Sequence, residues 1–342
     1  MSKFKSEVNK IEDVYRIKID VPFAVRYVCV YLFDVDDKKV LIDAGLNMGK
    51  WDEVFYSLLE DLKLTISDID YCIVTHRHID HVGLIKSFKR KNPNIQILMH
   101  DITEQNLKWE SDGSNHETID KIAKESSKLL IKYGMPEVFE RRMFNMISMW
   151  AKMTRYQKPD KVLQNGDEII FPTNKLKTIW TPGHSMGHIC IFDNNKKYLY
   201  SGDHILSRIT PHIGNFLINP DLKVKCDIDF NDILAHYLKS LDVISDLNPK
   251  IIFPAHQDVI YNPQERINEI KLHHEKRLKE ISSLIENKPM TPFEISKIHF
   301  GEDLDDINSY LALSEVLGHL IYLENQEKVT RIERDEKFYF SC

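Results

Sequence analysis

The sequence lacks several features that would each indicate a particular class of protein. Cysteine is scarce: Cys29, Cys72, Cys190, Cys226 and Cys342 are scattered, odd in number, and form no CxxC pair. We therefore expect reduced thiols and a cytoplasmic location.

Long hydrophobic runs and an excess of positive charge are also missing. The charged start, MSKFKSEVNK, has no apolar core, so we expect no signal peptide. No apolar run reaches the ~18 residues of a transmembrane helix, and the most apolar stretch, 310–323, contains Glu315 and His319. The net charge of -6 offers no basic field for nucleic acid or an anionic membrane.

The 342 residues allow two domains, and a hydrophobic content of 42% is ample for a large core. Apolar, β-branched and aromatic runs predict strands at 27–33, 39–42, 71–74, 95–99, 168–171, 177–180, 188–192, 197–201 and 251–253. Helical spacing predicts helices at 51–62, 117–133, 136–156 and 231–247. We expect an α/β domain over residues 1–263, with a helical insert at about 101–164.

The character of the sequence changes near residue 263. Residues 264–287 read as a long charged helix, and the capping-box signature from Thr291 to Glu294 opens a second helix. A third helix is predicted at 306–325, and the alternation at 328–340 is typical of a hairpin. Residues 264–342 are therefore predicted to form a small winged-helix-like domain.

The sharpest local signal is the segment THRHIDHVG at 75–83. It places His76, His78, Asp80 and His81 within six positions, directly after an apolar strand. Imidazole and carboxylate groups are common ligands of first-row metals, and Zn²⁺ favours them. A loop allows all four side chains to converge, which a regular strand or helix would not. Four such residues in six positions favour a metal site over a solvated polar turn.

In three later segments, too, an apolar strand is followed by a residue that can bind a metal. His184 lies in TPGHSMGH, Asp203 in YLYSGDH and His256 in IIFPAH. Each signal is weak alone, because a single histidine after a strand is more often structural. Together with the first segment they make a set of seven side chains that we expect at one edge of a sheet.

The segment THRHIDH resembles the HxHxDH signature of the metallo-β-lactamase superfamily, and the three later residues follow in that family's order. The resemblance covers roughly residues 15–260 and implies a four-layer αββα sandwich with metals at one edge. It implies that His76, His78 and His184 hold one metal, that Asp80, His81 and His256 hold the other, and that Asp203 bridges them. It also implies that Asp43, in VLIDAG, orients a ligand, although an aspartate that forms a turn before Gly45 is as good an explanation.

The resemblance implies a hydrolase that uses two metal ions, zinc first, with iron or manganese as alternatives. Two metals ~3.5–4 Å apart lower the pKa of water from about 15.7 toward ~7, so hydroxide can attack a carbonyl or phosphoryl centre. We expect Asp80 to orient this hydroxide or shuttle its proton in addition to binding metal. Flavodiiron-type relatives have a glutamate where His78 stands, which argues against that branch.

The residues that would face the substrate are harder to identify. We expect His188 to pack or form a structural hydrogen bond, and His204 to point away from the site. For His212, a position facing the substrate and a position away from it are equally good interpretations. The insert helix at 136–156 is rich in methionine and aromatic residues, including Met146 and Trp150. Two interpretations stay open: a lid over an acyl or aromatic substrate, and ordinary core packing or a homodimer interface.

Within the superfamily, the chain is most similar to the β-lactamase-like protein 2 branch, and it shares its metal set with glyoxalase II-like thioesterases. This implies a small-molecule ester, thioester or lactone substrate with an apolar part. The branch also includes an RNA endonuclease, but residues 289–342 hold eleven acidic and five basic residues, a net of -6. Such a negative net charge disfavours binding of nucleic acid.

A non-catalytic sensor and a mononuclear iron persulfide oxygenase are the other classes to test.

Overall fold

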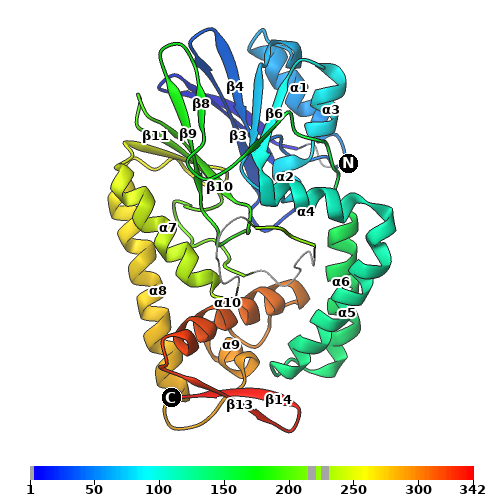
Figure 1. Cartoon of the computed structure of the whole chain (residues 1–342), viewed down its shortest axis with the longest axis vertical. Helices are drawn as coiled ribbons and strands as arrows, with labels where there is room; N and C mark the ends of the chain where they lie inside the picture. Colours follow the sequence, from blue (N-terminus) through cyan, green and yellow to red (C-terminus); the bar gives the residue numbers. More distant parts are fainter. Residues whose placement is uncertain (1–3, 215–220, 225–230) are drawn as a thin grey trace.

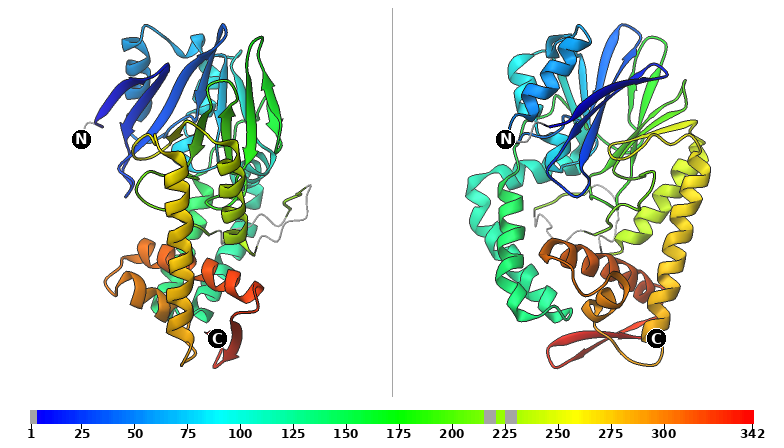
Figure 2. Two further views of the ribbon diagram at one scale, coloured as in Figure 1. Left: turned by 90° about the vertical axis from the view of Figure 1, so that its left-hand side faces the viewer. Right: turned by 180° about the vertical axis from the view of Figure 1, so that it is seen from behind.

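Two β-sheets stacked face to face form one end of the molecule, and a group of helices with a small hairpin forms the other (Figures 1 and 2). This computed structural model describes residues 4–214, 221–224 and 231–342, except for the side chains of residues 150 and 151. The helices α5 (His116–Lys132) and α6 (Glu140–Lys152) run along one flank, and α8 (Pro263–Ile285) runs along the other.

The larger sheet has seven strands in sequence order. They are β1 (Ser6–Ile11), β2 (Val14–Asp20), β3 (Tyr27–Val35), β4 (Lys38–Ile42), β5 (Tyr71–Val74), β6 (Gln96–His100) and β7 (Lys161–Leu163). Strands β1 to β4 pair antiparallel, and β4 to β7 pair parallel. Helices α1 (Trp51–Asp61), α2 (Ile79–Val82) and α3 (Ile85–Lys91) belong to the crossovers among its parallel strands.

The smaller sheet has five strands in the order β12-β11-β10-β9-β8. They are β8 (Glu168–Ile170), β9 (Lys175–Trp180), β10 (Ile189–Asp193), β11 (Tyr198–Gly202) and β12 (Ile251–Pro254). Helix α7 (Ile233–Leu247) connects β11 to β12, which therefore pair parallel. Helices α7 and α8 pack on the outer face of this sheet through Leu241 and Ile267.

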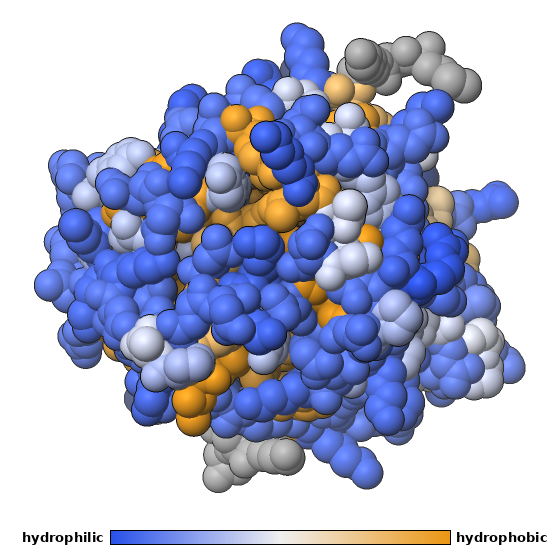
Figure 3. Space-filling view, turned by 90° about the horizontal axis from the view of Figure 1, so that it is seen from above, coloured by the Kyte–Doolittle hydropathy of each residue, from blue (hydrophilic) through white to orange (hydrophobic). Residues whose placement is uncertain are grey.

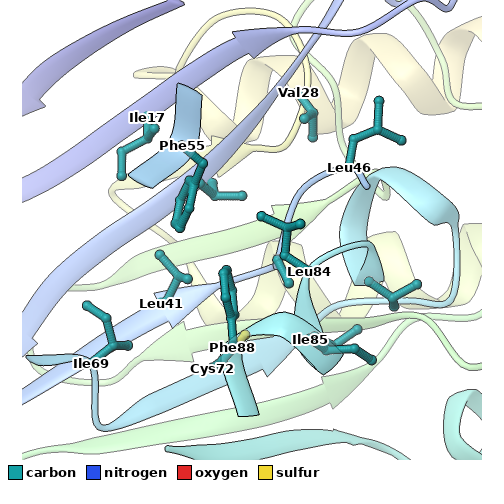
Figure 4. Close-up of a cluster of buried hydrophobic side chains, with 14 of the residues drawn as sticks. Ile17, Val28, Leu41, Leu46, Phe55, Ile69, Cys72, Leu84, Ile85 and Phe88 are labelled. Atoms are coloured by element: carbon teal, nitrogen blue, oxygen red, sulfur yellow. The ribbon is translucent and has the colours of Figure 1, made fainter. Parts of the chain in front are cut away.

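The strands are apolar on both faces because each face is buried in a different core. In β3, Val28, Val30 and Leu32 face the cluster beneath α1 and α3, which Figure 4 shows with Phe55 and Phe88. The alternate residues Cys29, Tyr31, Phe33 and Val35 face the cluster between the two sheets. The continuous apolar run at 27–33 is thus explained by the αββα layering, since a strand buried on both faces cannot alternate with polar residues.

The helix predicted at 136–156 is present but shorter, since α6 spans Glu140–Lys152, so the predicted bounds are wrong. Pro136 is extended, and a short 3-10 turn at Glu137–Phe139 precedes α6. The first closed turn is the i+3 bond from the Phe139 amide to the Pro136 carbonyl, at 2.9 Å. Helix α4 (Asp101–Ser111) lies within the predicted helical insert but was not located as a helix of its own, and strand β7 was not predicted.

The C-terminal region has the predicted order of three helices and a hairpin. After α8 come α9 (Pro292–Phe300), α10 (Asp306–Asn325), β13 (Thr330–Arg334) and β14 (Lys337–Ser341). The capping box from Thr291 to Glu294 is present. Met135 and Met143 of the insert are buried in one core with residues of α8, α9 and α10, so the insert and the C-terminal helices pack together.

Figure 3 views the end of the sandwich remote from the C-terminal helices, where apolar atoms lie in small patches among hydrophilic side chains. Within the described ranges, none of the helices combines the length and apolarity needed to span a membrane.

Candidate metal centre

The predicted site residues lie at the ends of strands on one edge of the sandwich. Asp43 follows β4, His76 follows β5 after one residue, and His184 follows β9. Asp203 follows β11 directly, and His256 lies two residues after β12. Because these strands end at a common edge, residues as distant in sequence as 43 and 256 come together.

A first group consists of three imidazoles and a carboxylate. His76 Nε2 lies 2.9 Å from His78 Nδ1, which lies 3.0 Å from His184 Nε2. Asp203 Oδ2 lies 3.3 Å from His184 Nε2 and 4.0 Å from His76 Nε2. All four donor atoms lie within 4.8 Å of one another. The separations of 2.9–4.0 Å bracket the ~3.4 Å spacing of ligands that share a tetrahedral zinc with Zn–N of ~2.0–2.1 Å.

A second group, Asp80, His81 and His256, lies on the other side of Asp203. His81 Nε2 lies 3.7 Å from Asp80 Oδ1 and 3.5 Å from Asp203 Oδ1. His256 Nε2 lies 3.6 Å from Asp80 Oδ2 and 3.3 Å from Asp203 Oδ2. Asp203 is therefore the one side chain in these two groups whose carboxylate faces both. Asp80 and His81 lie on the short helix α2, so the expected loop is in part a helical turn.

Each histidine but one is held by its Nδ1, which fixes where its lone pair points. Nδ1–H of His184 donates to the carbonyl of His212 at 3.1 Å, and that of His256 donates to the carbonyl of Tyr27 at 2.7 Å. An imidazole that donates from Nδ1 while neutral has its lone pair on Nε2. The Nε2 atoms of both ligands are thus acceptors that face the site.

Asp43 and Thr75 fix the other two histidines in the same tautomer. Nδ1–H of His81 donates to Asp43 Oδ2 at 2.8 Å. The Thr75 hydroxyl donates to Asp43 Oδ2 at 2.9 Å, so its oxygen accepts from His76 Nδ1–H at 3.0 Å. Asp43 Oδ1 also accepts the Thr75 amide at 2.7 Å. Sequence reasoning missed Thr75, although a hydroxyl next to a ligand histidine was a readable signal.

These donors fit divalent cations. The Nε2 atoms of His76 and His184 both face Nδ1 of His78, and the buried atoms His81 Nε2 and Asp203 Oδ1 have no hydrogen-bond partner among the described residues. Buried polar atoms rarely lack a hydrogen-bond partner in folded proteins. Two cations, one in each group with Asp203 between them, would satisfy all of these atoms.

The electrostatics of the site favour positive charge. Burial alone would raise the pKa of Asp203, but His256 and His81 hold it well below the usual value. Burial lowers the pKa of His81, yet the carboxylates of Asp203, Asp43 and Asp80 outweigh it and bring the pKa to about 10. In contrast, burial and the neighbouring imidazoles hold the pKa of His76 well below 6.5. His76 is therefore already neutral, whereas a cation would have to displace the proton of His81, because an imidazole binds metal only when neutral. The carboxylates that hold that proton would equally stabilise a bound cation.

His188 positions Asp203 without contacting the two groups' donor atoms. Its Nδ1 lies 2.8 Å from the Thr181 hydroxyl, and its Nε2 accepts the backbone amide of Asp203 at 3.1 Å. Gly202, with φ +50°, leaves room for this contact: a Cβ there would lie 2.7 Å from His188 Nε2 and 2.8 Å from Thr75 Oγ1. The sequence-based expectation that His188 forms a structural hydrogen bond agrees with this geometry.

The remaining named residues lie around the site. His204 turns toward α7, where its Nε2 lies 3.2 Å from the Ser240 hydroxyl. The ring of His212 contacts Ser314 of α10. Met146 is partly buried against the core shared by the insert and the C-terminal helices. The side chain of Trp150 lies outside the described residues, so its predicted position is not tested.

A third buried group, His274, Glu315 and His319, has a different geometry. His274 Nδ1 and His319 Nε2 lie 3.0 Å apart, but their ring centroids are 5.2 Å apart and the rings are nearly coplanar, at 27°. In the ligand pairs, the same N–N separation goes with centroids 4.5–4.6 Å apart and nearly perpendicular rings. The His274 and His319 nitrogens therefore face each other head-on, as in an N–H···N hydrogen bond, rather than aiming at a third point.

Comparison with known proteins agrees with this geometry. The model of the metallo-β-lactamase superfamily matches residues 24–256, which is more than half of the chain. The chain belongs to the metallo-β-lactamase superfamily. The model of the metallo-β-lactamase-like C-terminal domain matches residues 278–341. The resemblance drawn from THRHIDH is therefore confirmed.

Individual relatives cover most of the chain. The "Probable metallo-hydrolase YqjP" of Bacillus subtilis is 28% identical over 330 residues, or 96% of this chain and 98% of that protein. The "Beta-lactamase-like protein 2 homolog" of Caenorhabditis elegans is 27% identical over 80% of this chain and 71% of that protein. The "Acyl-coenzyme A thioesterase MBLAC2" of Homo sapiens is 27% identical over 54% of this chain and 64% of that protein.

A solved structure shows the same fold. The β-lactamase domain protein from Burkholderia ambifaria superposes with a TM-score of 0.79 at 20% identity, covering 98% of this chain and 93% of that chain. The αββα sandwich and the C-terminal elements thus form one arrangement that both chains share. The α/β sandwich with a small C-terminal region, as predicted from the sequence, is confirmed.

Proposed function

We propose that this metallo-β-lactamase-fold hydrolase uses two divalent cations to cleave a carboxylic ester, thioester or lactone. The observation that carries the proposal is the position of Asp203, whose two oxygens lie within 3.3–3.5 Å of His184, His256 and His81. A carboxylate between two groups of imidazole lone pairs is the arrangement that a two-metal hydrolase needs. Zinc is the metal that this donor set favours, with iron or manganese as alternatives.

The proposed assignment follows the two groups in the structure. His76, His78 and His184 would hold one cation, Asp80, His81 and His256 the other, with Asp203 shared. Bound there, the cations would lower the pKa of water to about 7 and polarise the substrate's carbonyl oxygen. Asp43 and Thr75 would keep the histidine lone pairs aimed at the site.

Asp80 is the residue that we propose to hold a proton during turnover. Its side chain is 12% exposed, and its oxygens lie 3.6–3.7 Å from His256 Nε2 and His81 Nε2. A carboxylate there can orient the attacking water and then accept its proton for transfer to the leaving group. A thiolate leaving group needs that proton least, because its pKa of about 8.5 is far below that of an alkoxide.

A thioester is the substrate class that we place first. A relative named for acyl-coenzyme A thioesterase activity matches 54% of this chain. The apolar insert packed on the C-terminal helices offers partly exposed methionines, such as Met149 at 61% and Met153 at 38% exposure, for an acyl chain. The acidic balance of residues 289–342 speaks against a nucleic-acid substrate.

The test is a substrate panel run on metal-free protein and on protein reconstituted with Zn²⁺, Mn²⁺ or Fe²⁺. The panel holds acyl-coenzyme A thioesters, p-nitrophenyl esters, lactones, a bis-p-nitrophenyl phosphate and an RNA oligonucleotide. We expect thioester or ester cleavage that requires metal and is lost in Asp203→Asn. Cleavage of the phosphodiesters alone would overturn the proposed substrate class. One iron per chain with oxygen uptake on a persulfide would instead indicate an oxygenase, and no turnover would favour a sensor.

Two further proposals concern the whole chain. We propose two domains, 1–263 and 264–342, although α8 contributes Ile267 to the core of the sandwich and Ile281 to that of the C-terminal helices. We also propose a reducing, cytoplasmic location, which the unpaired buried thiols of Cys29, Cys72 and Cys190 support.

A further inference from the structure

The segment 211–214 connects a candidate metal ligand to helix α10 of the C-terminal region. The carbonyl of His212 accepts the Nδ1–H of His184 at 3.1 Å. The ring of the same His212 is hydrogen-bonded to Ser314 on α10. The Ser314 hydroxyl donates to the Leu311 carbonyl at 3.0 Å, so its oxygen accepts from His212 Nε2–H. One residue thus bonds a ligand through its backbone and α10 through its side chain.

Two other contacts hold the segment against the same helix. The carboxylate of Glu315 accepts a hydrogen bond from the backbone amide of Ile213, whose side chain is 1% exposed. A Cβ at Gly214 would lie 3.2 Å from Ser314 Oγ and 3.3 Å from Ser314 Cβ, so the backbone passes close to the helix. The orientation of the His212 carbonyl is therefore set largely by α10.

Helix α10 is itself fixed to α8 by the buried histidine pair. His319 Nδ1–H donates to the Glu315 carbonyl at 2.7 Å, which leaves His319 Nε2 to accept His274 Nδ1–H at 3.0 Å. His274 and His319 are 0% and 1% exposed. Because α8 also packs on the five-stranded sheet through Ile267, the sheet, α8, α10 and the segment 211–214 form one continuous packed support.

We propose that α10 is part of the metal centre's framework and that Ser314 is a positioning residue for His184. The inference rests on the proposed function in that it takes His184 as a metal ligand. Without the acceptor oxygen of Ser314, the His212 ring is released, its carbonyl turns, and the His184 tautomer is no longer held. Loss of such a partner of a ligand histidine typically weakens metal binding about 10–100-fold.

The experiment compares the metal affinity of the full-length wild type with that of Ser314→Ala, using Zn²⁺ and a competing chelator. The matched control is Ser309→Ala, because Ser309 is also buried on α10, at 7% exposure, but donates to the Leu304 carbonyl and not to segment 211–214. We expect Ser314→Ala to bind one of its two zinc ions about 10–100-fold more weakly. We expect Ser309→Ala to bind both as the wild type does.

A second pair of variants keeps the test decisive if Ser314→Ala is poorly folded. His212→Gln retains an N–H donor near the position of Nε2 and should bind zinc nearly as the wild type does, whereas His212→Leu should show the weakened affinity. Equal affinities in all variants that fold would overturn the role of α10, provided that the wild type binds two zinc ions. If the wild type binds no metal, the proposed function fails first, and the two failures are thereby distinguished.

Discussion

The imidazole of His81 donates from Nδ1 to the carboxylate of Asp43 at 2.8 Å, and its Nε2 faces Asp203 at 3.5 Å. Asp43 is 1% exposed and also accepts both the amide and the hydroxyl of Thr75. This one carboxylate therefore sets the direction of His81 and, through Thr75, of His76. It has φ +67°, a conformation that asparagine and aspartate tolerate better than other residues with a side chain.

We expect Asp43→Asn to weaken metal binding about 10–100-fold while the backbone is preserved. Losing the charged acceptor should also lower the free energy of unfolding of the metal-free protein by roughly 1.5–3 kcal/mol. Chelator competition and urea titration measure the two effects. Asp36→Asn is the control, since Asp36 has φ +53° but is exposed and bonds Thr173. An Asp43→Asn protein with wild-type affinity and stability would contradict this role.

We expect Gly202→Ala to be far more damaging than Gly166→Ala. Both glycines have positive φ, +50° and +86°, so both substitutions strain the backbone by about 1–2 kcal/mol. A Cβ at Gly166 meets nothing within 4 Å, whereas one at Gly202 would press on His188 and Thr75. Overpacking adds about 1–3 kcal/mol. Urea titration of the metal-free variants measures the difference in the free energy of unfolding. Equal losses of stability would show that His188 and Thr75 move away from the new Cβ without destabilising the fold.

We expect Glu315→Gln to change how stability depends on pH. Burial, opposed by Arg277 and the Ile213 amide, raises the pKa of Glu315 from 4.5 to about 7. A carboxyl that binds its proton more tightly when folded stabilises the fold below pH 4.5, and this contribution is lost as the pH rises to about 7. It amounts to about 3 kcal/mol at most.

The variant Glu315→Gln cannot lose a proton, so its stability relative to the wild type should rise between pH 4.5 and 7. Urea titrations of both proteins at several pH values measure this difference, and Glu302→Gln, at an exposed residue, is the control. A difference that stays constant across that range would mean that Glu315 titrates normally in the folded protein.

We expect Met146→Ala to lower stability without raising KM. Met146 packs against the core that contains Met143, which is 0% exposed, and Leu317. Truncating a buried methionine costs about 2–5 kcal/mol, and a partly buried one less. Met149→Ala, at a residue 61% exposed, should leave stability within about 0.5 kcal/mol. A raised KM for an acyl substrate with unchanged stability in Met146→Ala would instead support the lid.

The fold was predictable from the sequence to the extent that its strands are buried on both faces. The run at 27–33 and the short runs at 71–74 and 251–253 are apolar throughout, which is typical of strands with both faces buried. Helix α4 was not located within the insert and strand β7 was not predicted, because α4 carries mixed polarity and β7 has only three residues. The start of α6 was misplaced because proline suits a first helical turn, whereas Pro136 is extended here, with ψ 142°.

The candidate ligands were predictable because each follows a strand end, and the THRHIDH segment holds four of them. Their supporting partners were not. His184 is held by a carbonyl at residue 212, which depends on Ser314, 102 residues farther along the chain. His256 is held by the carbonyl of Tyr27. Backbone carbonyls have no residue signature, so only the folded structure identifies such partners.

The most direct test of the two-metal centre is an anomalous diffraction map of zinc-loaded crystals, collected at the zinc edge. We predict two peaks, ~3.5–4 Å apart, on either side of Asp203, one near His76, His78 and His184 and the other near Asp80, His81 and His256. A single peak, or none next to Asp203, would contradict the account.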